Sequence, residues 1–254
     1  MSIIRPLGPI LCLLFLAMPV GAAEALPEGF VHLRDVAPSV VQDMRYATAH
    51  NFIGRPIDGY AAGECILTND AATRLAGVQD RLVPAGFTLI VWDCYRPARA
   101  VADFKAWSTD PDDQKMKAEF YPNSDKRSFF ADGYLANRSR HSSGSTVDLG
   151  IANLEDARKP PFPVADLVSC LAPFGERYDD RALDLGTGYD CLDPVASFDD
   201  PTISAEARQN RTTLRELMVE AGFKPYGKEW WHFELADEPF PRQYFDFLVE
   251  GTGQ

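Results

Sequence analysis

Two short stretches that lie far apart in the sequence restrict what this chain can fold into. The first covers residues 141–148 (HSSGSTVD), and the second covers residues 229–232 (EWWH). Together they contain two of the four histidines in the chain, along with two carboxylates. A catalytic zinc ion takes three protein ligands and works beside a carboxylate that accepts a proton from water. We therefore expect a fold that brings both stretches into a single site.

Alternation of polar and apolar residues predicts that both stretches continue into β-strands. Asp148 lies on the less apolar face of the first strand, and His232 lies on the more polar face of residues 230–235. Gly144 allows a tight turn just before the first strand, so His141 can fold back toward Asp148. If the two strands are neighbours, all three side chains can meet at one metal ion.

The same pattern leaves the identity of the catalytic base open. A shift of three positions along a strand reverses the face, so Glu229 reaches the side of His232 only if it sits on a bend. Glu234 lies two positions beyond His232 and shares its face. We favour Glu229, because residues 227–228 (GK) are typical of a loop, in which the chain can bend before the strand begins.

Each of these residues also has an ordinary structural interpretation. A single histidine is more often a hydrogen-bonded structural residue than a ligand, and an aspartate after a Gly/Ser turn often only stabilises that turn. Tryptophans beside a histidine are typical of a core strand. Only the combination favours a metal site. A serine nucleophile is disfavoured, because Ser142, Ser143 and Ser145 have no neighbouring base with a third orienting group.

Residues 139–148 (SRHSSGSTVD) resemble the S-x-H-x-x-G-x-A-x-D motif of zinc D-Ala peptidases, with Thr146 in the place of the usual alanine. Residues 229–232 resemble the E-x-W-H motif of the same enzymes. Further matching stretches are residues 46–48 (YAT), 51–56 (NFIGRP), 92–97 (WDCYRP) and 186–190 (GTGYD). With these, the chain resembles D-alanyl-D-alanine dipeptidases of the VanX type from about residue 40 to residue 248.

The resemblance implies a hedgehog/D-Ala-D-Ala peptidase-like fold and a role for each candidate residue. It implies zinc ligands His141, Asp148 and His232 for one Zn²⁺ per chain, catalytic residues Glu229 and Arg96, and substrate-binding residues Tyr46, Ser139 and Asp190. Glu229 would take the proton of the attacking water, and Arg96 would hold the developing oxyanion. Asp190, helped by the Tyr46 hydroxyl, would pair with the substrate's ammonium. From the residues alone, Arg96 is expected to pair with Asp93, and Asp190 to be a turn residue.

The function that these residues imply is zinc-dependent hydrolysis of the small dipeptide D-alanyl-D-alanine, in cell-wall metabolism or glycopeptide resistance. One alternative is a D,D- or L,D-carboxypeptidase that trims longer peptidoglycan peptides, which would need a pocket open beyond the amino-terminal residue. Another is a zinc-bearing binding module that has lost catalysis. The presence of both Glu229 and Arg96 argues against that module, because binding alone needs neither.

Residues 1–23 have the features of a secretory signal peptide. Arg5 precedes an apolar run over residues 10–20, and small residues at 21–23 offer a cleavage site; the run is too short for a membrane span. We expect an exported, periplasmic protein without a membrane anchor after cleavage, with residues 24–254 as one zinc D-Ala-D-Ala dipeptidase domain. The net charge of −12 argues against nucleic acid as a partner.

Four cysteines follow the signal peptide: Cys65, Cys94, Cys170 and Cys191. An even number in an exported protein suggests disulfides, and four cysteines allow three pairings. The absence of a C-x-x-C spacing disfavours a cysteine zinc site. We expect the pairs Cys65–Cys94 and Cys170–Cys191, because each joins stretches that the fold should bring together; free buried thiols are the alternative.

The remaining pattern predicts a single α+β domain with a central, largely antiparallel sheet and helices packed on it. We expect helices over residues 68–82, 98–107 and 204–221, and strands over residues 41–46, 87–92, 146–151, 182–185 and 230–235. Thr68 and Ser204 are the expected N-caps, and Gly222 is the expected stop after the last helix.

Overall fold

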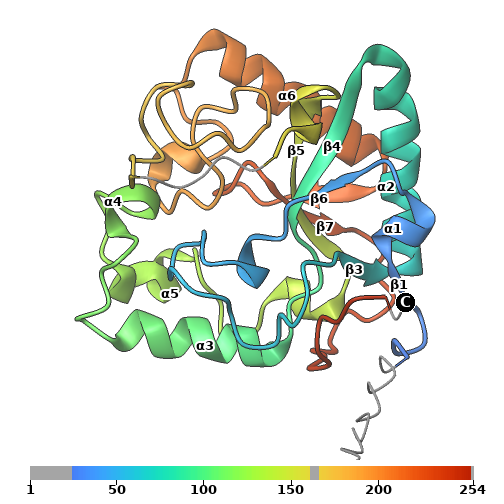
Figure 1. Ribbon diagram of the computed structural model, residues 1–254, viewed down its shortest axis with the longest axis horizontal. Coiled ribbons are helices and arrows are strands. Elements are labelled where there is room, and N and C mark those ends of the chain that lie inside the picture. Colours follow the sequence, from blue (N-terminus) through green and yellow to red (C-terminus); the bar gives the residue numbers. More distant parts are fainter. Residues whose placement is uncertain (1–24, 161–165, 253–254) are drawn as a thin grey trace, which may run out of the picture.

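The computed structural model of the protein describes residues 25–160 and 166–252 (Figure 1). The predicted signal peptide lies outside the described residues. The helices are α1 Leu33–Val36, α2 Asn69–Leu82, α3 Ala98–Thr109, α4 Lys117–Phe120, α5 Phe129–Asp132 and α6 Ala205–Glu220. The strands are β1 Phe30–His32, β2 Val41–Gln42, β3 Ile66–Thr68, β4 Phe87–Asp93, β5 Thr146–Asn153, β6 Phe223–Pro225 and β7 His232–Leu235. Short 3₁₀ helices that bear on the site cover Arg45–Ala47 and Arg140–Ser143.

Five strands form the central sheet, in the order β2-β4-β5-β7-β6. β2 runs parallel to β4, and the other three pairings are antiparallel. β1 and β3 form a separate two-stranded antiparallel sheet. The predicted α+β fold with a largely antiparallel central sheet is therefore confirmed.

Two long helices pack against the sheet, and their ends follow the predicted signals. The hydroxyls of Thr68 and Ser204 accept hydrogen bonds from the first-turn N–H groups of Ala71 and Ala207. Such a cap satisfies a donor that the helix leaves free and is worth about 1 kcal/mol. α2 contacts β4, and α6 contacts β5 and β6 (Figure 1). None of the described helices combines the length and apolarity needed to cross a bilayer.

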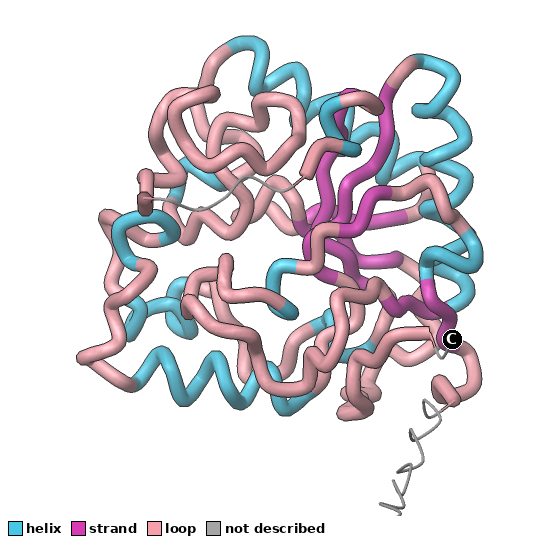
Figure 2. Tube along the Cα trace, in the orientation of Figure 1, coloured by secondary structure: helices cyan, strands magenta, loops and turns pink. Residues whose placement is uncertain are grey.

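The core has two parts of different composition. One surrounds the sheet, α2 and α6 and is largely aliphatic; its fully buried members include Leu75 and Leu149. The other is largely aromatic and includes Phe52, Phe104 and Trp107. Figure 2 shows the strands gathered in one part of the molecule, with helices and loops making up the rest. The candidate site draws residues from both parts.

The first expected strand is shorter than predicted. β2 stops at Gln42, and Tyr46 sits in the 3₁₀ turn that follows. Arg45 accounts for this change of direction, because its buried guanidinium pairs with both Asp43 and Asp180. The turn places Tyr46 in the aromatic part of the core.

The expected strand at residues 182–185 is wrong. These residues form a loop, although Leu183 donates a backbone hydrogen bond to Ile151 of β5. The Asp184 carboxylate accepts a hydrogen bond from the N–H of Gly186 two positions later. Aspartates that bond nearby backbone N–H groups favour turns over strands, which explains why the weak alternation does not become a strand.

Both expected disulfides are present. Cys65–Cys94 joins the residue before β3 to the residue after β4. Cys170–Cys191 joins two positions in the loops between β5 and α6. The Cα atoms of the two pairs are 5.3 Å and 5.6 Å apart. The favoured pairing among the three possibilities is therefore confirmed.

Candidate metal centre and substrate pocket

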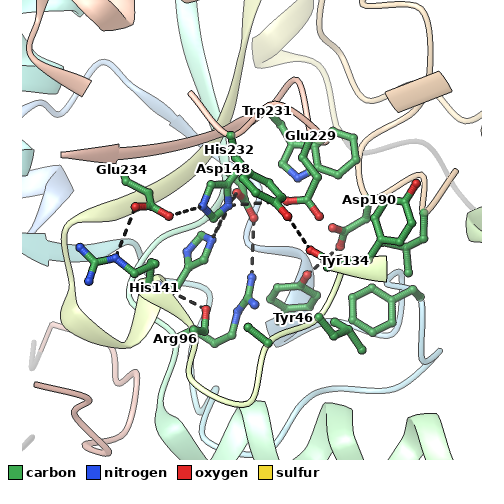
Figure 3. Close-up of a pocket in the computed structure, with 18 of the residues that line it drawn as sticks. Tyr46, Arg96, Tyr134, His141, Asp148, Asp190, Glu229, Trp231, His232 and Glu234 are labelled. Atoms are coloured by element: carbon green, nitrogen blue, oxygen red, sulfur yellow. Dashed lines mark hydrogen bonds and ion pairs between the residues drawn. The ribbon is translucent and has the colours of Figure 1, made fainter. Parts of the chain in front are cut away.

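One pocket contains every residue that the sequence singled out for metal, catalytic or substrate contacts (Figure 3). Its lining includes Tyr46, Arg96, Ser139, His141, Asp148, Asp190, Glu229 and His232. The cavity has a volume of about 220 Å³. Pockets for drug-sized ligands usually measure ~300–1,000 Å³, so this cavity suits a smaller molecule.

β5 and β7 bring two of the candidate ligands together. In the antiparallel pairing of these strands, Asp148 lies directly opposite His232. The neighbouring pair on the two strands, Val147 and Phe233, is fully buried, as the predicted alternation requires. Facing residues on neighbouring strands have Cβ atoms roughly 4.5–5.5 Å apart, so the two side chains can share one ion.

His141 reaches the same point from the 3₁₀ helix Arg140–Ser143, just before β5. Gly144 ends this helix with φ +84°, a conformation that residues with side chains rarely adopt. A Cβ atom at this position would also lie 2.1 Å from the Phe30 ring. The turn predicted at Gly144 is confirmed, and it leaves His141 beside Asp148.

The spacing of the three side chains is close to that of ligands around a tetrahedral zinc ion, with two of the three distances slightly shorter. His141 Nε2 lies 3.2 Å from His232 Nδ1 and 3.3 Å from Asp148 Oδ1, and the latter two atoms are 3.1 Å apart. Ligand atoms about 2.0–2.2 Å from a tetrahedral zinc ion stand roughly 3.3–3.6 Å from one another. Two imidazoles and a carboxylate also suit zinc chemically. These residues could therefore hold a metal ion.

Each imidazole has a partner on the side away from the other ligands. His141 Nδ1 lies 2.7 Å from the Cys94 carbonyl oxygen and 3.3 Å from a carboxylate oxygen of Asp93. His232 Nε2 lies 3.5 Å from Glu234 Oε1. Partners of this kind fix the ring orientation and decide which nitrogen is free to bind a metal.

Asp148 is held in its charged form. Burial alone would raise its pKa, but the imidazoles of His141 and His232 outweigh burial and hold the pKa well below its usual value. The Tyr189 hydroxyl donates a hydrogen bond to Asp148 Oδ2 at 3.1 Å. A carboxylate that stays ionised although buried is prepared to bind a cation.

Glu229 lies in the turn between β6 and β7, which confirms that it sits on a bend. Its Oε2 is 3.7 Å from His232 Nδ1, the nitrogen that faces the other two ligands. Glu234 approaches the opposite nitrogen and accepts a hydrogen bond from Arg140. Burial raises the pKa of Glu229 to about 7, although the charge of His232 opposes the shift. Glu229 thus has the position and the pKa for proton exchange near neutral pH.

Arg96 is a buried cation in the pocket lining. Its Nε donates to Asp93 at 2.9 Å, and its Nη2 lies 3.7 Å from Asp148. The guanidinium carbon is 5.1 Å from the ring centres of both Tyr46 and Phe104. Arg96 therefore pairs with Asp93, as its structural interpretation predicted, and also lies in the pocket, as the resemblance implied. A guanidinium held this firmly can stabilise a developing oxyanion without reorganising first.

A second buried carboxylate lies at the end of the pocket away from Glu234 (Figure 3). This carboxylate belongs to Asp190, and Tyr46 donates a hydrogen bond to its Oδ2 at 2.8 Å. Burial raises the pKa of Asp190 well above its usual value, and the charge of Asp148 adds to the shift. Asp190 also has φ +57°, a left-handed conformation uncommon outside glycine. A bound cation would relieve the cost of this buried carboxylate.

Ser139 has a structural contact as well as a place in the pocket. Its Oγ accepts a hydrogen bond from the His141 N–H at 3.3 Å and so caps the short helix that carries the histidine. The hydroxyl hydrogen can still be donated to another group. The predicted contact of Ser139 with substrate stays a prediction.

Three supporting contacts were not predicted from the sequence. They are the contact of Asp93, the expected partner of Arg96, with His141; the hydrogen bond from Tyr189 to Asp148; and the pairing of Arg140 with Glu234. Asp93 and Tyr189 lie inside the matching stretches 92–97 and 186–190, which was the available signal. Arg140 lies at a variable position of its motif, so nothing in the pattern marked it.

The fold and this site place the protein in the class of metallopeptidases. A model of peptidase family M15, described as D-ala-D-ala dipeptidase, matches residues 27–159 and 177–250. The chain belongs to this family. The resemblance first noted in the short motifs is therefore confirmed over most of the sequence.

Similar proteins named D-alanyl-D-alanine dipeptidase come from several bacteria. The protein from Enterococcus faecium is 35% identical over 222 residues, which covers 87% of this chain and 98% of that protein. The protein from Streptomyces coelicolor is 36% identical over 220 residues, with 87% and 98% covered. The Escherichia coli protein is 28% identical over 226 residues, with 87% and 94% covered. This chain therefore spans nearly the whole of each relative.

Proposed function

We propose that this protein hydrolyses the dipeptide D-alanyl-D-alanine, with one zinc ion held by His141, Asp148 and His232. Relatives with that activity in their name match almost end to end. The observation that carries the proposal is the layout of one small cavity. A candidate metal triad lies beside Glu229, and the buried carboxylate of Asp190 lies at one end (Figure 3).

A bound zinc ion would lower the pKa of water and polarise the scissile carbonyl. Glu229 would accept the proton of the attacking water and return it to the leaving amine, for which a pKa of about 7 is suitable. Arg96 would donate to the carbonyl oxygen as negative charge grows there. We assign Glu234 an orienting role, because it contacts the nitrogen of His232 that faces away from the other ligands.

Asp190 and Tyr46 would bind the substrate's free amino group. A dipeptide carries an ammonium one residue from the scissile bond, and this cation can neutralise the buried Asp190 carboxylate. A longer peptide would bring a neutral amide to the same place and leave the carboxylate buried without a cation. This argument, with the small volume of the cavity, favours the dipeptidase over a carboxypeptidase.

We also propose that the protein works after export to the periplasm. Disulfides persist in oxidising compartments and are rare in the cytosol, so both observed pairs support this location. The signal peptide on which the prediction first rested is part of the sequence but not of the described structure.

A panel of substrates tests the proposal directly. Purified protein, with zinc measured by elemental analysis, would be incubated with D-Ala-D-Ala, N-acetyl-D-Ala-D-Ala, L-Ala-L-Ala and a pentapeptide that ends in D-Ala-D-Ala. We expect about one zinc per chain and cleavage of D-Ala-D-Ala roughly 10- to 100-fold faster than of its N-acetyl form, since a charged hydrogen bond contributes about 1.5–3 kcal/mol.

Other outcomes would replace the proposal with one of its alternatives. If the pentapeptide and the N-acetyl dipeptide are cleaved as fast as the free dipeptide, the protein is a carboxypeptidase. If the protein carries a full complement of zinc, binds D-Ala-D-Ala and cleaves none of the four peptides, it is a binding module.

A further inference from the structure

One residue of the internal segment that the family model leaves out is attached to the amino-group end of the pocket. The model matches residues 27–159 and 177–250, and residues 160–176 fall between them. Cys170 belongs to this segment, and its disulfide partner, Cys191, directly follows Asp190. A covalent bond therefore links a segment outside the family match to the residue next to the proposed ammonium-binding carboxylate.

Cys170 holds the chain on both sides of Tyr189 and Asp190. Its carbonyl oxygen accepts a hydrogen bond from the Gly188 N–H at 2.9 Å, and its Sγ is bonded to Cys191. The two backbones pack closely, since a Cβ atom on Gly188 would lie 3.4 Å from the Cβ of Cys170. Tyr189 and Asp190 are therefore fixed between two attachments to a single residue.

Both of the residues held in this way contact the site. Tyr189 donates a hydrogen bond to Asp148, and Asp190 accepts one from Tyr46. The φ of +57° at Asp190 is a strained conformation that persists only when its surroundings enforce it. Residues 186–193 belong to no helix or strand, so a regular backbone ladder does not supply this enforcement.

Cys170 is in turn anchored to the end of α4. Its N–H donates to the carbonyl oxygen of Glu119 at 2.9 Å, and the Leu192 N–H donates to the carbonyl oxygen of Phe120 at 2.8 Å. Glu119 and Phe120 are buried, as are both cysteines of the pair. The loop around Asp190 is therefore tied to a fixed part of the molecule in two ways, directly through Leu192 and covalently through the disulfide.

We propose that Cys170 and Cys191 are positioning residues for the substrate's amino group, because their disulfide keeps the Asp190 carboxylate where the ammonium binds. The proposal rests on the function assigned above to Asp190. Without the bond, Asp190 can relax toward an ordinary backbone conformation and move its carboxylate. A displacement of about 1 Å in a site can cost on the order of 100-fold in activity. The metal triad, held by β5, β7 and the 3₁₀ helix just before β5, should remain intact.

The first experiment compares the double variant Cys170→Ala/Cys191→Ala with Leu75→Ala. Leu75 is fully buried in α2, outside the pocket lining, so its truncation lowers stability, as the loss of a disulfide does, without touching the site. We expect the double variant to raise KM for D-Ala-D-Ala about tenfold or more, with zinc content retained and kcat changed by less than about threefold. Leu75→Ala should leave KM unchanged. An unchanged KM in the double variant would overturn the inference.

A double-mutant cycle with Asp190→Ala shows whether the disulfide acts through that residue. If it does, its removal in the Asp190→Ala background should raise KM no further. An equal additional rise in that background would mean that the disulfide acts elsewhere, and the inference would fall. If Asp190→Ala itself leaves KM unchanged, the proposed amino-group site is wrong, which is a different result.

Native reduction provides a second route if the alanine variants do not fold. Wild-type protein would be reduced with a phosphine and alkylated, and mass spectrometry would report which pair has opened in each fraction. Fractions with Cys170–Cys191 open and Cys65–Cys94 closed should show the raised KM together with full zinc. A normal KM in those fractions contradicts the proposal.

Discussion

The metal side of the pocket (His141, Asp148, His232 and Glu229) and its amino-group side (Tyr46, Asp190 and the Cys170–Cys191 disulfide) are built by different means. On the metal side, two of the residues face each other on paired strands of the central sheet. On the amino-group side, the residues come from a 3₁₀ turn and from a loop without regular structure (Figure 2).

The comparison shows which contacts fix the side-chain positions on each side of the pocket. Strand pairing fixes Asp148 opposite His232 through backbone hydrogen bonds that also hold together the sheet at the centre of the core. The loop around Asp190 has no such ladder. It is held by a disulfide, by the hydrogen bond from Tyr46 and by single backbone hydrogen bonds, and Asp190 itself is left-handed. Strained or buried polar groups of this kind lower stability and are typical of functional positions. The amino-group side should therefore be the more sensitive to small changes nearby.

The largest effect should come from breaking the metal side. His232→Ala removes one of the three proposed ligands, so we expect zinc binding and the proposed dipeptidase activity to be lost together. The matched control is His50→Ala, because His50 pairs with Glu119 and is not among the residues that line the pocket. Elemental analysis of both purified variants provides the measurement. A His232→Ala protein that keeps a full complement of zinc would show that the ligand assignment is wrong.

The next largest effect separates the two glutamates near His232. Glu229→Gln should lower kcat by about two to four decades and keep the zinc, because the amide cannot accept a proton. Glu234→Gln should lower kcat much less, since Glu234 approaches the outward nitrogen of His232 and not the inward one. Steady-state kinetics and zinc content of the pair are the readout. The reverse ranking would make Glu234 the base.

Arg96 lies at the boundary between the two sides, and Arg96→Lys should have a somewhat smaller effect. The lysine keeps the positive charge but cannot reproduce the guanidinium that binds Asp93 and lies against Tyr46 and Phe104. We expect kcat to fall by about 100- to 1,000-fold with KM and zinc content little changed, as for the loss of one oxyanion donor. A change confined to KM would instead assign Arg96 to ground-state binding.

The metal side was largely predictable from the sequence, for the physical reason that strands have a period of two. The alternation around Asp148 and His232 placed both on one side of the sheet, and Gly144 marked the turn that returns His141. Strict alternation also favoured Glu234 as the base. Residues 227–228 (GK) were the local signal for a turn, and this turn allows Glu229 to reach the inward nitrogen of His232.

The amino-group side could not be derived from periodicity. Nothing in the local pattern places Asp190 beside Tyr46, because the contact joins residues 144 positions apart through two irregular segments. Resemblance to a family supplied this pairing, and the even number of cysteines supplied the disulfide. The mistaken strand at residues 182–185 has the same origin, since side chains rather than a ladder decide the course of this loop.

The smallest expected effect concerns the stability of the protein without substrate, because the buried Asp190 carboxylate should lower the free energy of unfolding. Asp190→Asn keeps the shape and an acceptor for the Tyr46 hydroxyl but removes the ionisable group. Because the folded-state pKa of Asp190 is raised, both states hold the proton below about pH 4, near its ordinary value of 3.8. As the pH rises toward the folded-state pKa, only the unfolded chain loses the proton, so ionisation favours unfolding.

We therefore expect Asp190→Asn to melt at a higher temperature than the wild type, by more at pH 8 than at pH 5. A difference of a few degrees is expected, because about 1 kcal/mol shifts Tm by roughly 2–4 °C in a chain of this size. Calorimetry at the two pH values measures it, with zinc content checked in each sample. If Asp190→Asn is instead the less stable protein at pH 8, the buried Asp190 carboxylate does not lower the free energy of unfolding. The amino-group side would then be no more destabilising to the fold than the metal side.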